Sequence, residues 1–171
     1  MSRKMSAYKG SLIVPGFFQN DGALKTGIWK FDAGNLTAPG ELAIEISDQW
    51  QLNENERSVG CAEVSYYEGN LYYTTPKAVW KWDFSEPAKP EKVFELDKEN
   101  PNQIWYIHVA DGKIYYETAR YVNSAREQHE YVIDKDFKKV KQPIAVTSDV
   151  IEVKVGGSPH GDFLQAAAPG T

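Results

Sequence analysis

The stretch Tyr67-Glu-Gly-Asn-Leu-Tyr-Tyr73 decides the fold, because two related stretches occur in the same chain. Tyr8-Lys-Gly-Ser-Leu-Ile-Val14 precedes it, and Ala110-Asp-Gly-Lys-Ile-Tyr-Tyr116 follows it. Each contains a glycine suited to a tight turn, followed by an apolar and aromatic run typical of a β-strand. Self-similarity of this kind indicates a chain built from copies of one structural unit.

Two further signatures follow each turn glycine in the same order. The first reads Ile28-Trp-Lys-Phe-Asp32, Val79-Trp-Lys-Trp-Asp83 and Glu130-Tyr-Val-Ile-Asp134. The second reads Ala43-Ile-Glu-Ile-Ser47, Val93-Phe-Glu-Leu-Asp97 and Pro143-Ile-Ala-Val-Thr147. Successive copies lie about fifty residues apart, a spacing typical of repeat architectures. We therefore expect three copies of one unit.

The signatures predict strands, because they alternate apolar and polar positions or form short β-branched and aromatic runs. Turn-forming clusters at 33–40 and 85–90 separate them. A fourth strand is expected before the turn glycine in the second and third copies, at Cys61–Tyr66 and Gln103–Val109. The first copy has only Met1–Ala7 there, where we expect no strand. The sequence thus predicts an all-β fold of three four-stranded antiparallel units.

Four antiparallel strands in about fifty residues match one propeller blade in size and connectivity. The pattern resembles the β-propeller repeat families, particularly the YWTD-like and TolB-like groups, through Gly69–Tyr73 and Val79–Asp83. The YWTD tetrapeptide itself does not occur in the sequence. The resemblance extends over nearly the whole chain and implies three propeller-like blades, enough for half of a six-bladed ring. It implies no particular activity.

This interpretation divides the chain into a repeat region and a tail. We expect the repeat region at 1–156, with the tail extending over 157–171 and containing many small residues. The expected copies and the closing strand lie at about 8–47, 61–97, 103–147 and 149–155.

The two ends of the repeat region predict self-association. A missing strand before Gly10 and a surplus strand at 149–155 would complement each other if two chains exchanged that strand, giving a six-bladed homodimer. A monomeric three-unit sheet or sandwich is the alternative, with its open edge covered by the tail or by charged residues. A fragment of a larger propeller would show the same mismatch.

Composition excludes several functional classes. The formal net charge of −5 argues against a nucleic-acid partner. We expect no membrane span, because no apolar run is long enough, and no signal peptide, so the default location is cytoplasmic. The single cysteine, Cys61, excludes an intramolecular disulfide and a cysteine-rich zinc site.

No catalytic or metal-binding motif is recognised in the sequence. It contains no Gly-x-Ser-x-Gly elbow, no phosphate-binding glycine loop and no His-Glu-x-x-His. The three histidines, His108, His129 and His160, lack the spacing of a metal pair. We therefore predict no cofactor, no metal and no identifiable catalytic residue.

Aromatic residues divide into two groups. Trp29, Trp80 and Tyr131 recur at equivalent positions, which predicts a packing role. Function on a repeat scaffold usually lies where the copies differ, and aromatic and arginine side chains suit recognition surfaces. The residues that meet both criteria, and that we predict to bind a partner, are Trp50, Arg57, Trp105, Arg120, Tyr121 and Arg126.

The sequence favours a non-enzymatic binding or assembly module that presents loops to a protein or carbohydrate partner. One alternative is a hydrolase or lyase acting on a glycan or ester, with its site in the propeller channel. Another is a structural oligomer subunit, such as a virion or surface component. Opposed carboxylates in a deep polar pocket would favour the enzyme, and a shallow aromatic patch would favour the binding module.

Overall fold

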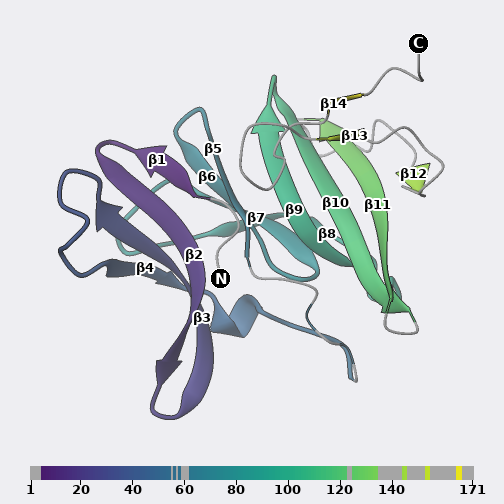
Figure 1. Ribbon diagram of the computed structural model, residues 1–171, viewed down its shortest axis with the longest axis horizontal. Coiled ribbons are helices and arrows are strands. Elements are labelled where there is room, and N and C mark those ends of the chain that lie inside the picture. Colours follow the sequence, from purple (N-terminus) through teal and green to yellow (C-terminus); the bar gives the residue numbers. More distant parts are fainter. Residues whose placement is uncertain are drawn as a thin grey trace.

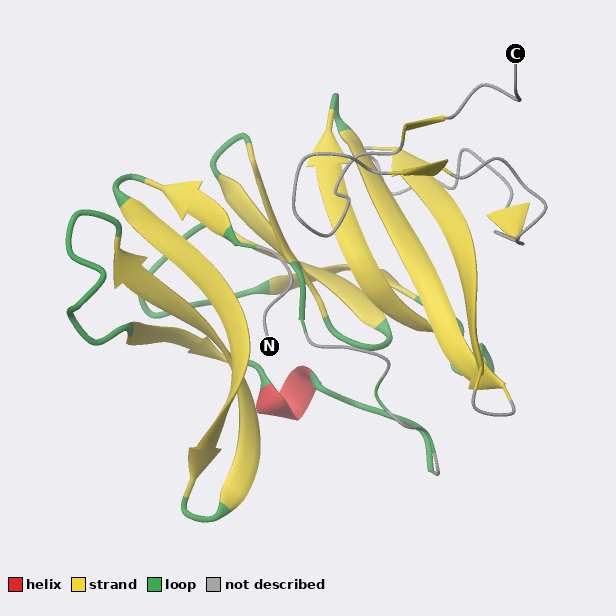
Figure 2. Cartoon of the chain, viewed as in Figure 1, coloured by secondary structure: helices red, strands yellow, loops and turns green. Residues whose placement is uncertain are grey.

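The computed structural model describes residues 5–54, 56, 58, 62–122, 125–134, 144–145, 153–154 and 165–166, with side chains up to Tyr121. Strands dominate it, and the one helical turn in these residues is a 3-10 helix, η1, at Ser47–Gln49 (Figure 2). The strands form three antiparallel four-stranded sheets and one two-stranded pair. The predicted all-β fold is therefore confirmed. Over the described residues, the sheets close into neither a ring nor a barrel.

The three sheets follow one another along the chain (Figure 1). Sheet 1 contains, in order, β1 at Ser6–Tyr8, β2 at Ser11–Asn20, β3 at Ala23–Asp32 and β4 at Glu41–Glu45. Sheet 2 contains β5 at Val64–Tyr67, β6 at Asn70–Thr74, β7 at Ala78–Trp82 and β8 at Glu91–Glu95. Sheet 3 contains β9 at Gln103–Ala110, β10 at Lys113–Val122, β11 at Ala125–Asp134 and β12 at Ile144–Ala145.

Two-residue turns join the first two strands of each sheet. In the β5–β6 turn, Glu68 has φ 45° and Gly69 has φ 85°. The turns at Lys9–Gly10 and Asp111–Gly112 also have two positive φ values. This is the type I′ pattern, whose twist matches that of the flanking strands. The predicted turn glycines are confirmed.

One expectation about the first copy is wrong. β1 pairs with β2 through Ser6↔Ile13, Ala7↔Leu12 and Tyr8↔Ser11, so a strand does precede the turn glycine. It was missed because three residues beside a charged segment carry little alternation. β1 is short in comparison with the eight-residue β9.

The third strands share an irregularity that supports the repeat. The β3–β4 register shifts between Ile28 and Trp29, and the β7–β8 register shifts between Val79 and Trp80, at equivalent positions of the two copies. A bulge adds a residue and increases the local twist of the strand. The first two copies thus share their backbone distortion as well as their sequence signatures.

Two apolar cores hold the three sheets together. The core between sheets 1 and 2 consists of Ile13, Ile28, Ile44, Ile46, Ala62, Val64, Leu71, Tyr73 and Trp82. The core between sheets 2 and 3 consists of Val79, Leu96, Ile104, Ile107, Val109, Ile114 and Tyr116. Sheet 2 therefore buries apolar side chains on both of its faces.

First strands also meet one another across the sheet boundaries, β1 beside β5 and β5 beside β9. The Tyr66 amide donates to Ser6 Oγ at 3.2 Å, and the Val109 amide donates to Ser65 Oγ at 3.0 Å. Ser6 and Ser65 each lie four residues before their turn glycine, so the same bond is made twice. This repetition shows that sheet 3 is docked on sheet 2 much as sheet 2 is docked on sheet 1.

In sheets 2 and 3, equivalent residues face the preceding sheet. We call the face that carries the second and fourth residues after the turn glycine the leading face of each sheet, and the opposite face the trailing face. Leu71 and Tyr73 lie on the leading face of sheet 2 and pack into the first core, whereas Tyr72 packs against the second core. In sheet 3 the leading positions are Ile114 and Tyr116, both in the second core. The alternation of β6 therefore directs its side chains to two different neighbouring sheets, and the alternation of β10 directs Ile114 and Tyr116 to sheet 2.

The predicted closing strand at 149–155 is described only at Val153–Lys154, β13, which pairs with β14 at Gln165–Ala166. β14 lies within the predicted tail. The strand exchange and the domain boundaries stay predictions. Among the described residues, no helix has the length and apolarity needed to cross a membrane.

Candidate functional site

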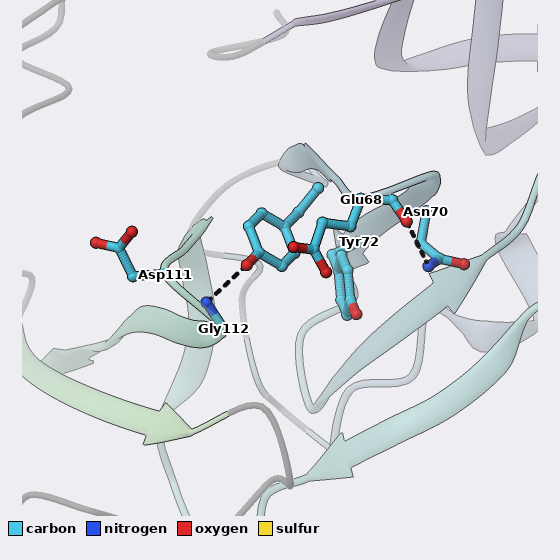
Figure 3. Close-up of a pocket in the computed structure, with 6 residues that line it drawn as sticks. Glu68, Asn70, Tyr72, Asp111 and Gly112 are labelled. Carbon is cyan, nitrogen blue, oxygen red and sulfur yellow. Dashed lines mark hydrogen bonds between the residues drawn. The ribbon is translucent and has the colours of Figure 1, made fainter.

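A hollow of about 440 Å³ opens between the β5–β6 and β9–β10 turns (Figure 3). Its lining comes from the end of β5, the start of β6 and the two turns. The lining residues are Tyr67, Glu68, Asn70, Tyr72, Asp111 and Gly112. Figure 1 shows these two turns side by side at the upper end of the sheets.

Backbone conformation places the two carboxylates of the hollow at the tips of their turns. Glu68 and Asp111 are the first turn residues of sheets 2 and 3, with φ values of 45° and 50°. Both side chains are exposed. The equivalent residue in sheet 1 is Lys9, whose ammonium lies 5.1 Å from the Tyr8 ring centre. Among the three described hairpin turns of this kind, the two with acidic tips are those of sheets 2 and 3, and both line the hollow.

Hydrogen bonds within the lining hold the two turns in place. The Gly112 amide donates to the Tyr67 hydroxyl oxygen at 2.9 Å, which joins sheet 2 to the turn of sheet 3. Asn70 Nδ2 donates to the Glu68 carbonyl at 3.3 Å. Both bonds are drawn in Figure 3. The two turns that form the hollow are thus joined by one hydrogen bond between the sheets, and one of them carries a bond of its own.

The surroundings of Tyr72 favour the protonated form of its hydroxyl, and its pKa lies above the ordinary value. Burial raises its pKa, and the nearby carboxylates of Glu68 and Glu91 act in the same direction, while Lys81 opposes them. A neutral phenol can both donate and accept a hydrogen bond. The hollow therefore offers phenol rings, carboxylates and an amide, and no basic side chain is among its lining residues.

The residues predicted to bind from the sequence lie elsewhere. Trp50 caps η1 and packs against the first core, with its ring edge-to-face with Phe17 at 5.7 Å. Trp105, on β9, donates from Nε1 to Glu117 Oε2 at 2.8 Å. η1 lies at the end of the sheets opposite the hollow in Figure 1. Trp50 therefore packs against the core between sheets 1 and 2, whereas Trp105 bonds within sheet 3.

The predicted arginines are only partly described. Arg120 is half-buried in β10, and Tyr121 beside it is 47% exposed. Arg126 is opposite Tyr121 in the β10–β11 register, but its side chain lies outside the described residues, and so does Arg57. The register thus brings Tyr121 and Arg126 together at one hairpin. The predicted binding role of these residues stays a prediction.

The two repeating tryptophans, Trp80 and Trp29, have different surroundings. Trp80 packs against the first core from the leading face of sheet 2, and its ring stacks on Tyr73 at 6.4 Å. Trp29, at the same position in sheet 1, is half-buried on that sheet's leading face. The Tyr131 side chain lies outside the described residues.

The hollow has little signal in the sequence. Its residues belong to repeating turns, whereas function on a repeat scaffold is expected where the copies differ. The usable signal was the change from Lys9 to Glu68 and Asp111 within an otherwise repeated turn.

Of the histidines and the cysteine considered as metal ligands, only His108 has a described side chain. His108 lies on β9 as predicted, with its ring 6.4 Å from that of Tyr115. Among the described residues, no group of three or more His, Cys, Asp or Glu could hold a metal. Cys61, His160 and the His129 side chain are outside them.

The sequence matches no protein-family model and no curated protein at a significant level.

Proposed function

We propose that this chain is a non-enzymatic binding module in which a propeller-like scaffold presents the hollow between sheets 2 and 3 to a carbohydrate. The observation that carries the proposal is the lining of that hollow, which combines two phenol rings with carboxylate and amide groups. Sites for small ligands are typically concave, with aromatic walls and a few polar groups that fix orientation.

The propeller-like scaffold is supported by three consecutive four-stranded antiparallel sheets, each formed by one copy of the repeat. The first strands meet one another, as the innermost strands of blades do in a propeller. Repeated bulges and repeated serine bonds support a common unit. On such a scaffold, function usually lies in turns and loops at one end of the blades.

The polar groups of the hollow favour a neutral ligand rich in hydroxyl groups. Glu68 and Asp111 accept hydrogen bonds, Asn70 both donates and accepts, and Tyr72 keeps its proton. An anionic ligand is disfavoured, because the charged lining residues are both acidic. Sugar hydroxyls bind such acceptors, while the ring face packs against an aromatic side chain.

The experiment is calorimetric titration of the full chain with a panel of neutral oligosaccharides. Binding should weaken at least about tenfold in Asp111→Asn, because a charged acceptor becomes a neutral amide. Asp21→Asn is the matched control, since Asp21 occupies the same position of a positive-φ turn, with φ 50°, at the β2–β3 hairpin. Its affinity should not change. If no oligosaccharide of the panel binds, or if both variants bind equally well, the proposal fails.

A protein-binding surface at the β10–β11 hairpin is a second candidate, favoured by the exposed ring of Tyr121 opposite Arg126. Tyrosine and arginine are enriched in interface hot spots. A pull-down with Tyr121→Ala as the comparison tests it, and equal capture by both chains would refute it.

The hydrolase alternative has one supporting observation, the two carboxylates lining the same hollow. Glycoside hydrolysis uses such a pair, one as acid and one as base or nucleophile. Turnover of chromogenic glycosides that is abolished by Glu68→Gln would support it. Binding without turnover supports the binding module instead.

A further inference from the structure

The leading face of sheet 1 is an apolar surface on which no described sheet packs. Direct cross-strand pairs place Leu12 opposite Phe31, Val14 opposite Trp29, and Trp29 opposite Leu42, so these five side chains share one face. All five are half-buried. A contiguous apolar sheet face of this kind marks an interaction surface.

Phe18 extends this surface toward the β2–β3 hairpin. Its ring meets that of Trp29 edge-to-face at 5.4 Å and 90°. A Cβ added to Gly27 would lie 2.5 Å from Leu42 Cδ1 and 3.1 Å from Phe18 Cε1, so both side chains close over that glycine. The leading face of sheet 1 is therefore packed and ordered before any neighbour is present.

The internal cores show what covers such a face elsewhere in the chain. Leu71 and Tyr73 are the sheet 2 equivalents of Leu12 and Val14, and the trailing face of sheet 1 buries both completely. Ile114 and Tyr116 are the sheet 3 equivalents, and the trailing face of sheet 2 buries them. In each described case, the occupant of a leading face is the trailing face of another copy of the repeat.

One trailing face is available to take this role. In sheet 3, Tyr115 is equivalent to Ile13 and Tyr72, the residues through which sheets 1 and 2 contact the sheet that follows them. Tyr115 pairs with His108 and Val132 on the outer side of sheet 3, and its side chain is half-buried. No described four-stranded sheet follows sheet 3, and the two-stranded β13–β14 sheet is the one described sheet after it in the chain.

We propose that a second copy of this chain covers these surfaces: the leading face of sheet 1 in one chain packs on the trailing face of sheet 3 in the other. Head-to-tail contacts close into a ring when the rotation permits. Propellers have four to eight blades, and six is the one multiple of three in that range. The expected assembly is thus a two-chain, six-sheet ring, formed by face packing rather than by exchange of the 149–155 strand. This inference does not depend on the proposed carbohydrate ligand.

The test measures the solution mass of the full chain by light scattering. The chain should have about twice its monomer mass of 19.3 kDa. Val14→Glu, on the leading face, and Tyr115→Glu, on the trailing face, should each reduce the mass to that of one chain while the circular dichroism spectrum is retained. Leu24→Glu is the control, because Leu24 is 68% exposed on the opposite face of sheet 1, and it should stay dimeric.

Mixing the two variants tests the direction of the contact. Val14→Glu keeps an intact trailing face, and Tyr115→Glu keeps an intact leading face, so an equimolar mixture should form heterodimers through one interface. Native mass spectrometry distinguishes the two chains by mass. Heterodimers in the mixture, with monomers in each separate sample, would support the proposal even if one variant were less stable than the other.

Three results would overturn it. A monomeric wild-type chain would mean that no second copy is needed, and that residues 122–171 or solvent cover the faces. A dimer unaffected by Tyr115→Glu would indicate a different interface, such as leading face against leading face. A mixture without heterodimers would exclude the head-to-tail arrangement.

Discussion

Tyr73 and Val14 occupy the same position of the repeat and have different surroundings. Tyr73 is fully buried, because sheet 1 covers the leading face of sheet 2. Val14 is half-buried, because no described sheet covers the leading face of sheet 1. The difference shows that burial at this position is supplied by the neighbouring sheet and is not a property of the hairpin itself.

The largest loss of stability should come from truncating Tyr73, whose side chain is covered by sheet 1. Tyr73→Ala removes a ring that is stacked on Trp80 and a hydroxyl that donates to Gln49 Oε1 at 2.8 Å. We expect a loss of about 3–5 kcal/mol in the free energy of unfolding. Val14→Ala should cost less than about 1 kcal/mol when both changes are made in the Tyr115→Glu chain. Urea denaturation measures the loss of stability in both variants. Equal losses would show that the neighbouring sheet does not determine the contribution of this position.

A smaller effect is expected at the lysine that links the loops on either side of sheet 2. Lys77 Nζ donates to Glu56 Oε1 at 2.8 Å and to the carbonyls of Asn100 and Asn102 at 3.0 Å each. Its side chain is only 15% exposed. Lys77→Met should therefore cost about 2 kcal/mol, since it leaves these acceptors without their charged donor.

Lys92→Met is the matched control for that change. Lys92 bonds Glu95 at 2.9 Å, with 41% of its side chain exposed, and a surface ion pair of this kind contributes less than about 0.5 kcal/mol. Thermal unfolding of both variants in the same buffer is the measurement. Equal destabilisation would show that Lys77 is no inter-loop link.

The buried hydroxyl of Tyr73 should make the free energy of unfolding depend on pH in the alkaline range. Burial raises the pKa of its hydroxyl above the ordinary value of 10.0. In the unfolded chain this hydroxyl loses its proton near pH 10, whereas the folded chain retains it, so the stability it contributes is lost as pH rises above that value.

Tyr73→Phe removes this contribution. The variant should lose about 1–2 kcal/mol at neutral pH through the missing bond to Gln49. The difference in the free energy of unfolding between wild type and variant should become smaller above pH 10. Urea unfolding at a series of pH values measures it. A constant gap would mean that Tyr73 titrates normally in the folded chain.

The smallest effects concern the two serine bonds between sheets. Ser65→Ala should cost about 1 kcal/mol, because its partner, the Val109 amide, is buried. Ser6→Ala should cost less, since its bond to the Tyr66 amide is exposed. The hydrogen-exchange rates of the Val109 and Tyr66 amides report on the two bonds separately. Unchanged exchange at Val109 in Ser65→Ala would show that the bond does not hold the two sheets together.

Much of the fold could be read from local sequence, because turn chemistry and strand alternation act over a few residues. Gly69 required a turn, and the Leu71–Tyr73 run required a strand with two different faces. β1 was missed, since three residues give too little alternation to distinguish a strand from a tail. Which face of each strand meets which sheet was not readable, because it depends on how the sheets pack.

The hollow was harder to predict than the sheets. Glu68 and Asp111 are distant in sequence, and only the docking of sheet 3 on sheet 2 brings their turns together. Trp50 packs against the first core and Trp105 donates a hydrogen bond to Glu117. Their binding role stays a prediction, because these contacts neither require nor exclude it.

Residue-resolved amide exchange in wild type and in Tyr115→Glu tests the central claim most directly. The claim is that a leading face is protected by the trailing face of another repeat, and Tyr115 is in sheet 3, far along the chain from sheet 1. We predict that amides of β2 around Val14 exchange faster in the variant, while those of β6 around Tyr73 keep their protection. Identical exchange of β2 in both chains would contradict the claim.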